Sequence, residues 1–127
     1  ICHLLRGKLI VSGQSPINIG DTSEPEPDLA ICQWSDDSYA LRHPFESEVL
    51  LVIEVSDSTL EYDLTVKKML YAEAGIPEYW VVDVKAKEVH RFTIPENGEY
   101  QKTEMLTGED EISLPGGASL SLKNILT

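Results

Sequence analysis

Residues 49–53 form an uninterrupted apolar run, and the carboxylate of Glu54 follows it directly. A half-buried strand alternates apolar and polar side chains, whereas a short run that is apolar at every position is typical of a strand covered on both faces. We therefore expect a central strand over about residues 49–55. Because a buried carboxylate without partners is costly, Glu54 is either satisfied by local hydrogen bonds or held there for a function.

The other segments predict a mixed sheet with one helix packed against it. Gly75, just before Pro77, ends a helix predicted within residues 56–75, and Ser58 or Thr59 caps its first turn. Apolar or alternating runs bounded by turn residues predict the remaining strands. The order of elements predicts an α+β fold, within the broad α/β class. Strands are expected at 8–11, 16–19, 28–33, 78–84, 88–94 and 99–106, with a loop at 35–48 and a docked edge segment from 112 onward.

Length and composition narrow the class of protein. A chain of 127 residues is expected to form a single domain over 1–127. Two cysteines are too few for a disulfide framework, so we expect a cytoplasmic protein in which Cys32 is a buried small side chain. The longest apolar run is too short to span a bilayer. Since the chain starts at Ile1 within apolar sequence, we expect that an N-terminal portion precedes it.

The two acids Asp28 and Glu54 are predicted to meet. Strands 28–33 and 49–54 are joined without a clear helical crossover, which favours antiparallel pairing. Pairing their ends places residue 28 opposite 54 and residue 33 opposite 49, on one face of the sheet. Adjacent carboxylates repel unless a cation lies between them, and hard oxygen ligands favour Mg²⁺ or Mn²⁺. In the alternative, Asp28 starts a turn and Glu54 accepts backbone N–H bonds.

The predicted helix presents a lysine on its core-facing side. At about 100° per residue, Lys67 falls within the arc shared by the apolar helix positions, whereas Lys68 falls outside it and is expected in solvent. Lys67 either reaches the carboxylates, where it would stabilise developing negative charge, or forms a salt bridge with Asp63 one turn earlier. The apolar positions that define the arc are Val66, Leu70, Tyr71 and Ala74.

Asp28 behind a proline, Glu54 at the end of an apolar strand and a nearby lysine together resemble the PD-(D/E)xK nuclease superfamily. The stretches "SEPEPDLAI" and "SLSLKNIL", and residues 49–83 above all, resemble the Uma family of endonucleases more closely. The resemblance extends from about Gly7 to Leu126. It implies a restriction-endonuclease-like fold in which the helical part that precedes the sheet is missing from this sequence.

The resemblance also implies which residues form the active site. Asp28 matches the aspartate of the Pro-Asp pair, and Glu54 matches the acid that begins the second motif. Where the superfamily commonly has a lysine two positions later, this chain has Ser56. The Uma pattern instead has a lysine on the following helix, and Lys67 matches it. Core and orienting roles are expected for four further matching residues: Tyr71, Tyr79, Trp80 and Asp83.

The sequence therefore predicts an endonuclease that uses Mg²⁺ or Mn²⁺ to hydrolyse DNA phosphodiester bonds. Asp28, Glu54 and the backbone carbonyl of Val55 are the expected metal ligands, and Lys67 offsets charge at the phosphate. A net charge of −12 predicts weak DNA binding unless a homodimer, a preceding segment or a separate partner supplies a basic surface. The alternatives are a catalytically inactive nuclease-fold module for interaction or regulation, and a structural ion site.

The histidines and serines add no second prediction. His3, His43 and His90 show no ligand or catalytic spacing, and His90 is expected as a surface or cross-strand residue. The serines and threonine after Glu54 are not in a nucleophile-elbow pattern, which favours loop and capping roles for them.

Overall fold

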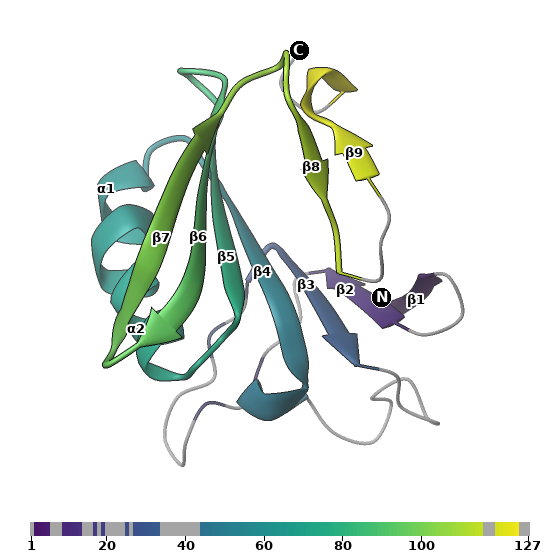
Figure 1. Ribbon diagram of the computed structural model, residues 1–127, viewed down its shortest axis with the longest axis vertical. Coiled ribbons are helices and arrows are strands. Elements are labelled where there is room, and N and C mark those ends of the chain that lie inside the picture. Colours follow the sequence, from purple (N-terminus) through teal and green to yellow (C-terminus); the bar gives the residue numbers. More distant parts are fainter. Residues whose placement is uncertain are drawn as a thin grey trace.

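A computed structural model describes residues 2–5, 9–13, 17, 19, 25, 27–33, 44–115 and 119–124 of the chain (Figure 1). Within these residues, seven strands form one sheet in sequence order, with β4 and β5 parallel and all other neighbours antiparallel. The fold is α+β, as predicted. The strands of this sheet are β1 (Cys2–Leu5), β2 (Leu9–Gly13), β3 (Leu29–Gln33), β4 (Val49–Ser56), β5 (Glu78–Asp83), β6 (Glu88–Glu96) and β7 (Glu99–Leu106).

One helical segment connects β4 to β5 and makes their parallel pairing possible. It comprises α1 (Leu60–Tyr62), the π-turn η2 (Asp63–Lys67) and α2 (Lys68–Glu73). Gly75 follows α2 with a φ of 76°, in the left-handed region where glycine carries no penalty, and the helix ends there as predicted. A short 3₁₀ turn, η1 (Glu46–Glu48), precedes β4.

The central strand β4 is covered on both faces, as the apolar run predicts. Val52 lies in the core beneath the helical segment, whereas Leu51 lies in the core on the opposite face. Figure 1 shows the helices on one side of the sheet and the hairpin of β8 (Glu111–Ser113) and β9 (Ser119–Ser121) on the other. The C-terminal segment is therefore docked, but as a separate two-stranded sheet rather than as an edge of the main one.

The hairpin side of the sheet has its own apolar cluster. Ile112 of β8 and Leu122, the first residue of the 3₁₀ turn η3 (Leu122–Asn124), are buried with Trp80 of β5. The cluster on the helix side contains Cys32, which is fully buried as expected, and a group of aromatic rings. Those rings belong to Tyr71, Tyr79, Phe92 and Tyr100.

The predicted register of β3 and β4 is correct at one end and wrong at the other. Leu29 pairs with Ile53, and this register, extended by one residue, is the predicted one that places residue 28 opposite 54. At the far end Cys32, not Gln33, pairs with Val49 because a bulge shifts the register after Ile31. The shift lies away from Asp28 and leaves the two acids at the same end of the sheet.

Several other predictions differ from the structure or lie partly outside it. Strand β1 was not predicted. Of the predicted strand 16–19, only Ile17 and Ile19 are described, and both are buried in the helix-side core. Most of the predicted loop 35–48 lies outside the described residues. In the described part of the chain, no helix is both long and apolar enough to cross a membrane.

Candidate active site

Glu54 is the most heavily bonded acid at the end of β4. Only 4% of the residue is exposed, and both carboxylate oxygens accept hydrogen bonds. Oε1 accepts a hydrogen bond from the backbone N–H of Asp28 at 3.0 Å. Oε2 accepts hydrogen bonds from Lys67 Nζ at 2.7 Å and from the Tyr71 hydroxyl at 3.3 Å. The buried charge is therefore balanced by an ammonium and two neutral donors. This arrangement makes a charged side chain tolerable at the end of so apolar a strand.

Asp28 and β4 are connected by a reciprocal pair of hydrogen bonds. While Glu54 accepts the backbone N–H of Asp28, Oδ2 of Asp28 accepts the backbone N–H of Val55 at 2.7 Å. The backbone N–H bond to Glu54 is what the alternative interpretation predicted. The other oxygen of Asp28 has no donor among the residues that the structure describes, and the residue is half-buried. One carboxylate oxygen of Asp28 is thus available, on a residue whose backbone is bonded to Glu54.

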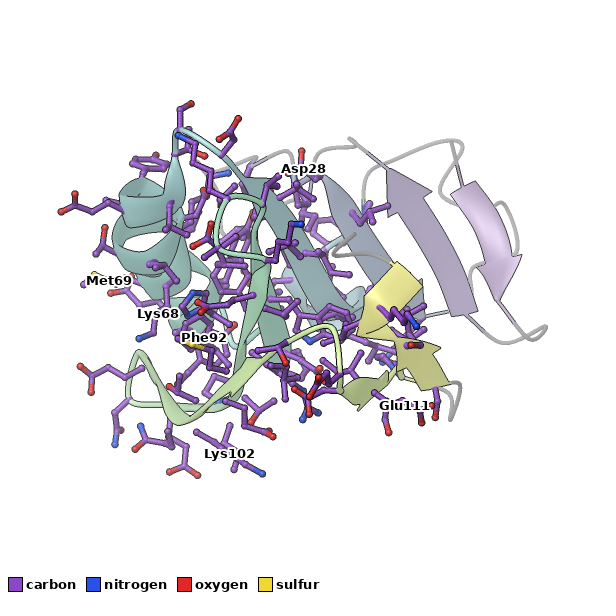
Figure 2. The ribbon with its side chains drawn as sticks, turned by 90° about the horizontal axis from the view of Figure 1, so that it is seen from above. Asp28, Lys68, Met69, Phe92, Lys102 and Glu111 are labelled. Carbon is purple, nitrogen blue, oxygen red and sulfur yellow. The ribbon has the colours of Figure 1, made fainter. Side chains whose placement is uncertain are left out.

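Lys67 reaches Glu54 from the helical segment. Its side chain is 21% exposed, and it forms an ion pair with Glu54 rather than with Asp63. Lys68, which was predicted to lie in solvent, is instead half-buried with Nζ 4.6 Å from the centre of the Phe92 ring (Figure 2). The prediction failed because an aromatic face of β6 lies beside the helix and attracts the cation.

The helical face differs from the predicted one at Val66, which is 53% exposed. The buried face carries Tyr71 together with the polar residues Asp63 and Lys67, which hydrogen-bond to the sheet. Val66 is about 100° around the helix from Lys67 and so lies off this face. Periodicity therefore placed Lys67 and Tyr71 on the buried face correctly but misplaced Val66.

Asp63 fixes the π-turn that carries Lys67. Its carboxylate, in a residue only 5% exposed, accepts hydrogen bonds from the Ser56 and Thr59 hydroxyls. The Tyr79 hydroxyl donates to the Asp63 backbone carbonyl at 2.8 Å. Turns of this kind are rare and often lie at functional sites. Sequence reasoning missed this role of Asp63, and Ser56, placed two residues after Glu54 on the same strand face, is the signal that could have suggested it.

The electrostatics of the site keep Tyr71 a hydrogen-bond donor. Burial, and then the negative charge of Glu54, raise the pKa of Tyr71 well above the ordinary value. The pKa of Tyr79 is raised by burial and then by the same carboxylate. Both hydroxyls remain protonated at neutral pH. Tyr71 therefore donates to Glu54, the acid that also pairs with Lys67.

The predicted site residues are thus brought to one place through Glu54: Lys67 contacts it directly, and Asp28 contacts it through the backbone. Asp83 lies in β5 opposite Ser56. The β5–β6 hairpin brings Asp83 together with Glu88 and His90. The sequence predicted no ligand spacing for His90. A hairpin with Glu88 and His90 two residues apart on one strand is the signal that could have found this group.

Comparisons with known proteins agree with this architecture. Among solved structures, the fold is similar to that of a putative nuclease belonging to DUF820 from Anabaena variabilis, with a TM-score of 0.67 and 17% sequence identity. The similarity covers 93% of this chain and 68% of that one, and at such low identity it shows the fold alone. No curated protein matches the chain. The family model Uma2, described as "Putative restriction endonuclease", matches residues 2–123. Because this match spans nearly the whole sequence, the chain belongs to the Uma2 family of putative restriction endonucleases.

Proposed function

We propose that this protein is an endonuclease that requires a divalent metal ion and hydrolyses phosphodiester bonds in DNA. The observation that carries the proposal is the meeting of an acid from β4, an acid beside β3 and an amine from the helical segment. Glu54 is bonded to Lys67 at 2.7 Å and to the backbone of Asp28 at 3.0 Å. Membership of a nuclease family and a nuclease-like fold agree with it.

The chemistry of the acids fits a hard cation such as Mg²⁺ or Mn²⁺. The ligands would be Asp28, through the oxygen that has no donor among the described residues, together with Glu54 and the backbone carbonyl of Val55. All of these are oxygen ligands, as hard divalent cations prefer. Such an ion, when bound, supplies an activated water and polarises the phosphate.

The protein's own groups would orient the site and balance charge. Lys67 places a positive charge against Glu54, where it could stabilise negative charge that develops on the phosphate. Tyr71 and the Asp28 backbone N–H hold the Glu54 carboxylate in one orientation. The reciprocal bond from Val55 to Asp28 does the same for the second acid.

The net charge of −12 predicts that the isolated chain binds DNA weakly. Binding energy from phosphate contacts depends on lysine and arginine, and this chain has 10 of them against 22 acids. We therefore propose that a second copy of the chain, a preceding segment or a separate protein contributes the basic surface.

Plasmid nicking with Mg²⁺ or Mn²⁺, compared with the same reaction in a chelator, tests the proposal. We expect Glu54→Gln and Lys67→Met to lower the nicking rate by about 100-fold or more, because each removes a group at the reacting centre. Lys68→Met is the matched control, since this neighbouring lysine contacts Phe92 instead of Glu54. Metal-independent cleavage, or equal loss in the Lys68 variant, would contradict the proposal.

A catalytically inactive nuclease-fold module is the second candidate. It is favoured by Ser56 at the position where the superfamily commonly has lysine, and by donors on both oxygens of Glu54. Thermal stabilisation by Mg²⁺ or Mn²⁺ without any nicking of plasmid or single-stranded DNA would support this module over the enzyme.

A further inference from the structure

Three side chains that can bind a metal converge on the β5–β6 hairpin. Asp83 pairs with Glu88 across the two strands, and His90 follows Glu88 by two residues, so all three project from one face of the sheet. One ligand atom from each lies within 4.8 Å of the other two. None of these residues belongs to the Glu54 site: Glu54 pairs with Val81, whereas Asp83 pairs with Ser56.

Among the described residues, no lysine or arginine forms an ion pair with this group. Asp83 is 8% exposed, and Oδ1 accepts the backbone N–H of Ala86 at 3.1 Å. Its second oxygen has no donor in the described part of the chain. The side chains of Glu88 and His90 likewise make no hydrogen bond or ion pair with described residues. The nearby Lys85 pairs with Asp57 instead, at 3.4 Å.

A cation between these side chains would relieve the repulsion between the two carboxylates. Two carboxylates directly opposite each other on neighbouring strands repel, and Asp83 is nine-tenths buried, where repulsion is poorly screened. The imidazole of His90 lies near both acids but too far away to form an ion pair with either of them. The three ligand atoms lie within 4.8 Å of one another, a spacing that a shared ion can bridge after small side-chain movements.

We propose that Asp83, Glu88 and His90 bind one Zn²⁺ or a similar borderline divalent cation. One imidazole and two carboxylates, with water in the fourth position, are an ordinary zinc ligand set, and the imidazole disfavours Mg²⁺. Zinc bonds of about 2.1 Å place tetrahedral ligands about 3.4 Å apart. Small side-chain rotations of the half-buried Glu88 and His90 toward the fixed Asp83 close the site. The ion would clamp β5 to β6 at the last backbone pair of the hairpin, Asp83 with Glu88.

The experiment uses the full chain after chelator treatment and dialysis. Titration with ZnCl₂ in a calorimeter, with millimolar Mg²⁺ present throughout, is expected to show one site. His90→Gln and Glu88→Gln are expected to weaken it at least tenfold. Glu111→Gln, an exposed acid on β8, is the matched control and keeps wild-type affinity. Glu54→Gln also keeps it, so the result is independent of the proposed nuclease site.

A second measurement needs no variant. In the NMR spectrum of the wild-type chain, Zn²⁺ is expected to shift the His90 imidazole resonances in a saturable way at one equivalent. Unchanged His90 resonances at one equivalent, or variants of His90 and Glu88 that bind like the wild type, would overturn the proposal and indicate an adventitious ion only. Binding lost on Glu54→Gln but retained on His90→Gln would also overturn it.

Discussion

At the scale of single residues, the site depends on how one buried carboxylate is satisfied. Glu54 is 4% exposed and has three donors, of which one is charged. Removing one partner of a buried charge is more damaging than removing both, because the remaining group stays desolvated and unpaired. Lys67 therefore supports the fold as well as the proposed chemistry. The same bonds that stabilise the end of β4 fix the direction of the carboxylate.

Tyr71→Phe tests whether the hydroxyl orients Glu54. We expect a loss of about 1 kcal/mol in the free energy of unfolding, because one buried hydrogen bond is removed while the ring remains. We also expect slower DNA nicking. Tyr100→Phe is the matched control: its buried hydroxyl donates to the Ile76 carbonyl at 2.8 Å, away from Glu54. Urea unfolding and nicking rates of both variants give the comparison, and equal effects on nicking would contradict an orienting role.

At the scale of elements, the π-turn decides where the lysine points. Asp63 anchors this turn through two hydroxyls, one from β4 and one from the loop before α1, and through the Tyr79 hydroxyl on its carbonyl. The strand, the loop and β5 thus hold a single turn of the helical segment. Lys67, the last residue of that turn, lies at the correct height to meet Glu54.

Asp63→Ala is expected to lower both stability and activity. The buried Ser56 hydroxyl loses its acceptor, which costs about 1–3 kcal/mol, and the released turn misplaces Lys67. Glu61→Ala, an exposed acid on α1, serves as the control and should change neither quantity appreciably. Thermal unfolding together with plasmid nicking measures both effects. Full activity of a folded Asp63→Ala protein would show that the π-turn does not position Lys67.

Two glycines allow the backbone requirement to be separated from packing. Gly75, at φ 76°, has no atom within 4 Å of an added Cβ, so Gly75→Ala is expected to cost about 1–2 kcal/mol through backbone strain alone. Gly98 has nearly the same φ, but an added Cβ would lie 3.3 Å from Cγ of Glu73. Gly98→Ala should therefore cost somewhat more than Gly75→Ala. When Gly98→Ala is made in a Glu73→Ala background, this extra cost should disappear. Denaturant titrations of the three variants check this.

At the scale of the whole molecule, the sheet separates two apolar cores. The aromatic core beneath the helical segment holds three tyrosines that are nearly or fully buried, and the opposite core is closed by Trp80 and the β8–β9 hairpin. Burial is the main cause that raises the pKa of each tyrosine. The second cause is the charge of Glu54 for Tyr71 and Tyr79, and the charge of Glu78 for Tyr100. These tyrosines are Tyr71, Tyr79 and Tyr100. Each of these phenols therefore stays protonated in the folded chain at pH values where a free tyrosine ionises.

We expect the free energy of unfolding to fall as pH rises above 10.0, the ordinary tyrosine pKa. The unfolded chain then releases protons that the folded chain retains, so the contribution is fully present below this pH and is lost above it. Three such groups give a slope approaching about 4 kcal/mol per pH unit. Tyr71→Phe should reduce the slope by about one third. Urea unfolding between pH 8 and 11 measures it, and a slope unchanged in the variant would contradict the assignment.

Much of the fold was predictable from local pattern. The apolar run at 49–53 identified the central strand, and Gly75 identified the end of the helix. The β3–β4 register was correct near Asp28 but failed at the bulge, because a bulge depends on how side chains of the neighbouring strand fit. Val66 and Lys68 were misplaced because polar residues on the buried helix face, and the Phe92 ring of β6 beside the helix, leave no periodic signal.

The sequence by itself determined that an acid ends the central strand and that Lys67 lies on the sheet-facing side of the next helix, since strand and helix periods are properties of the chain. Only the tertiary structure decided which donors satisfy that acid, how Asp63 holds the π-turn, and that His90 lies beside Asp83 and Glu88. These contacts join residues whose distance in sequence carries no information about their distance in space, so chain pairing and packing alone select them.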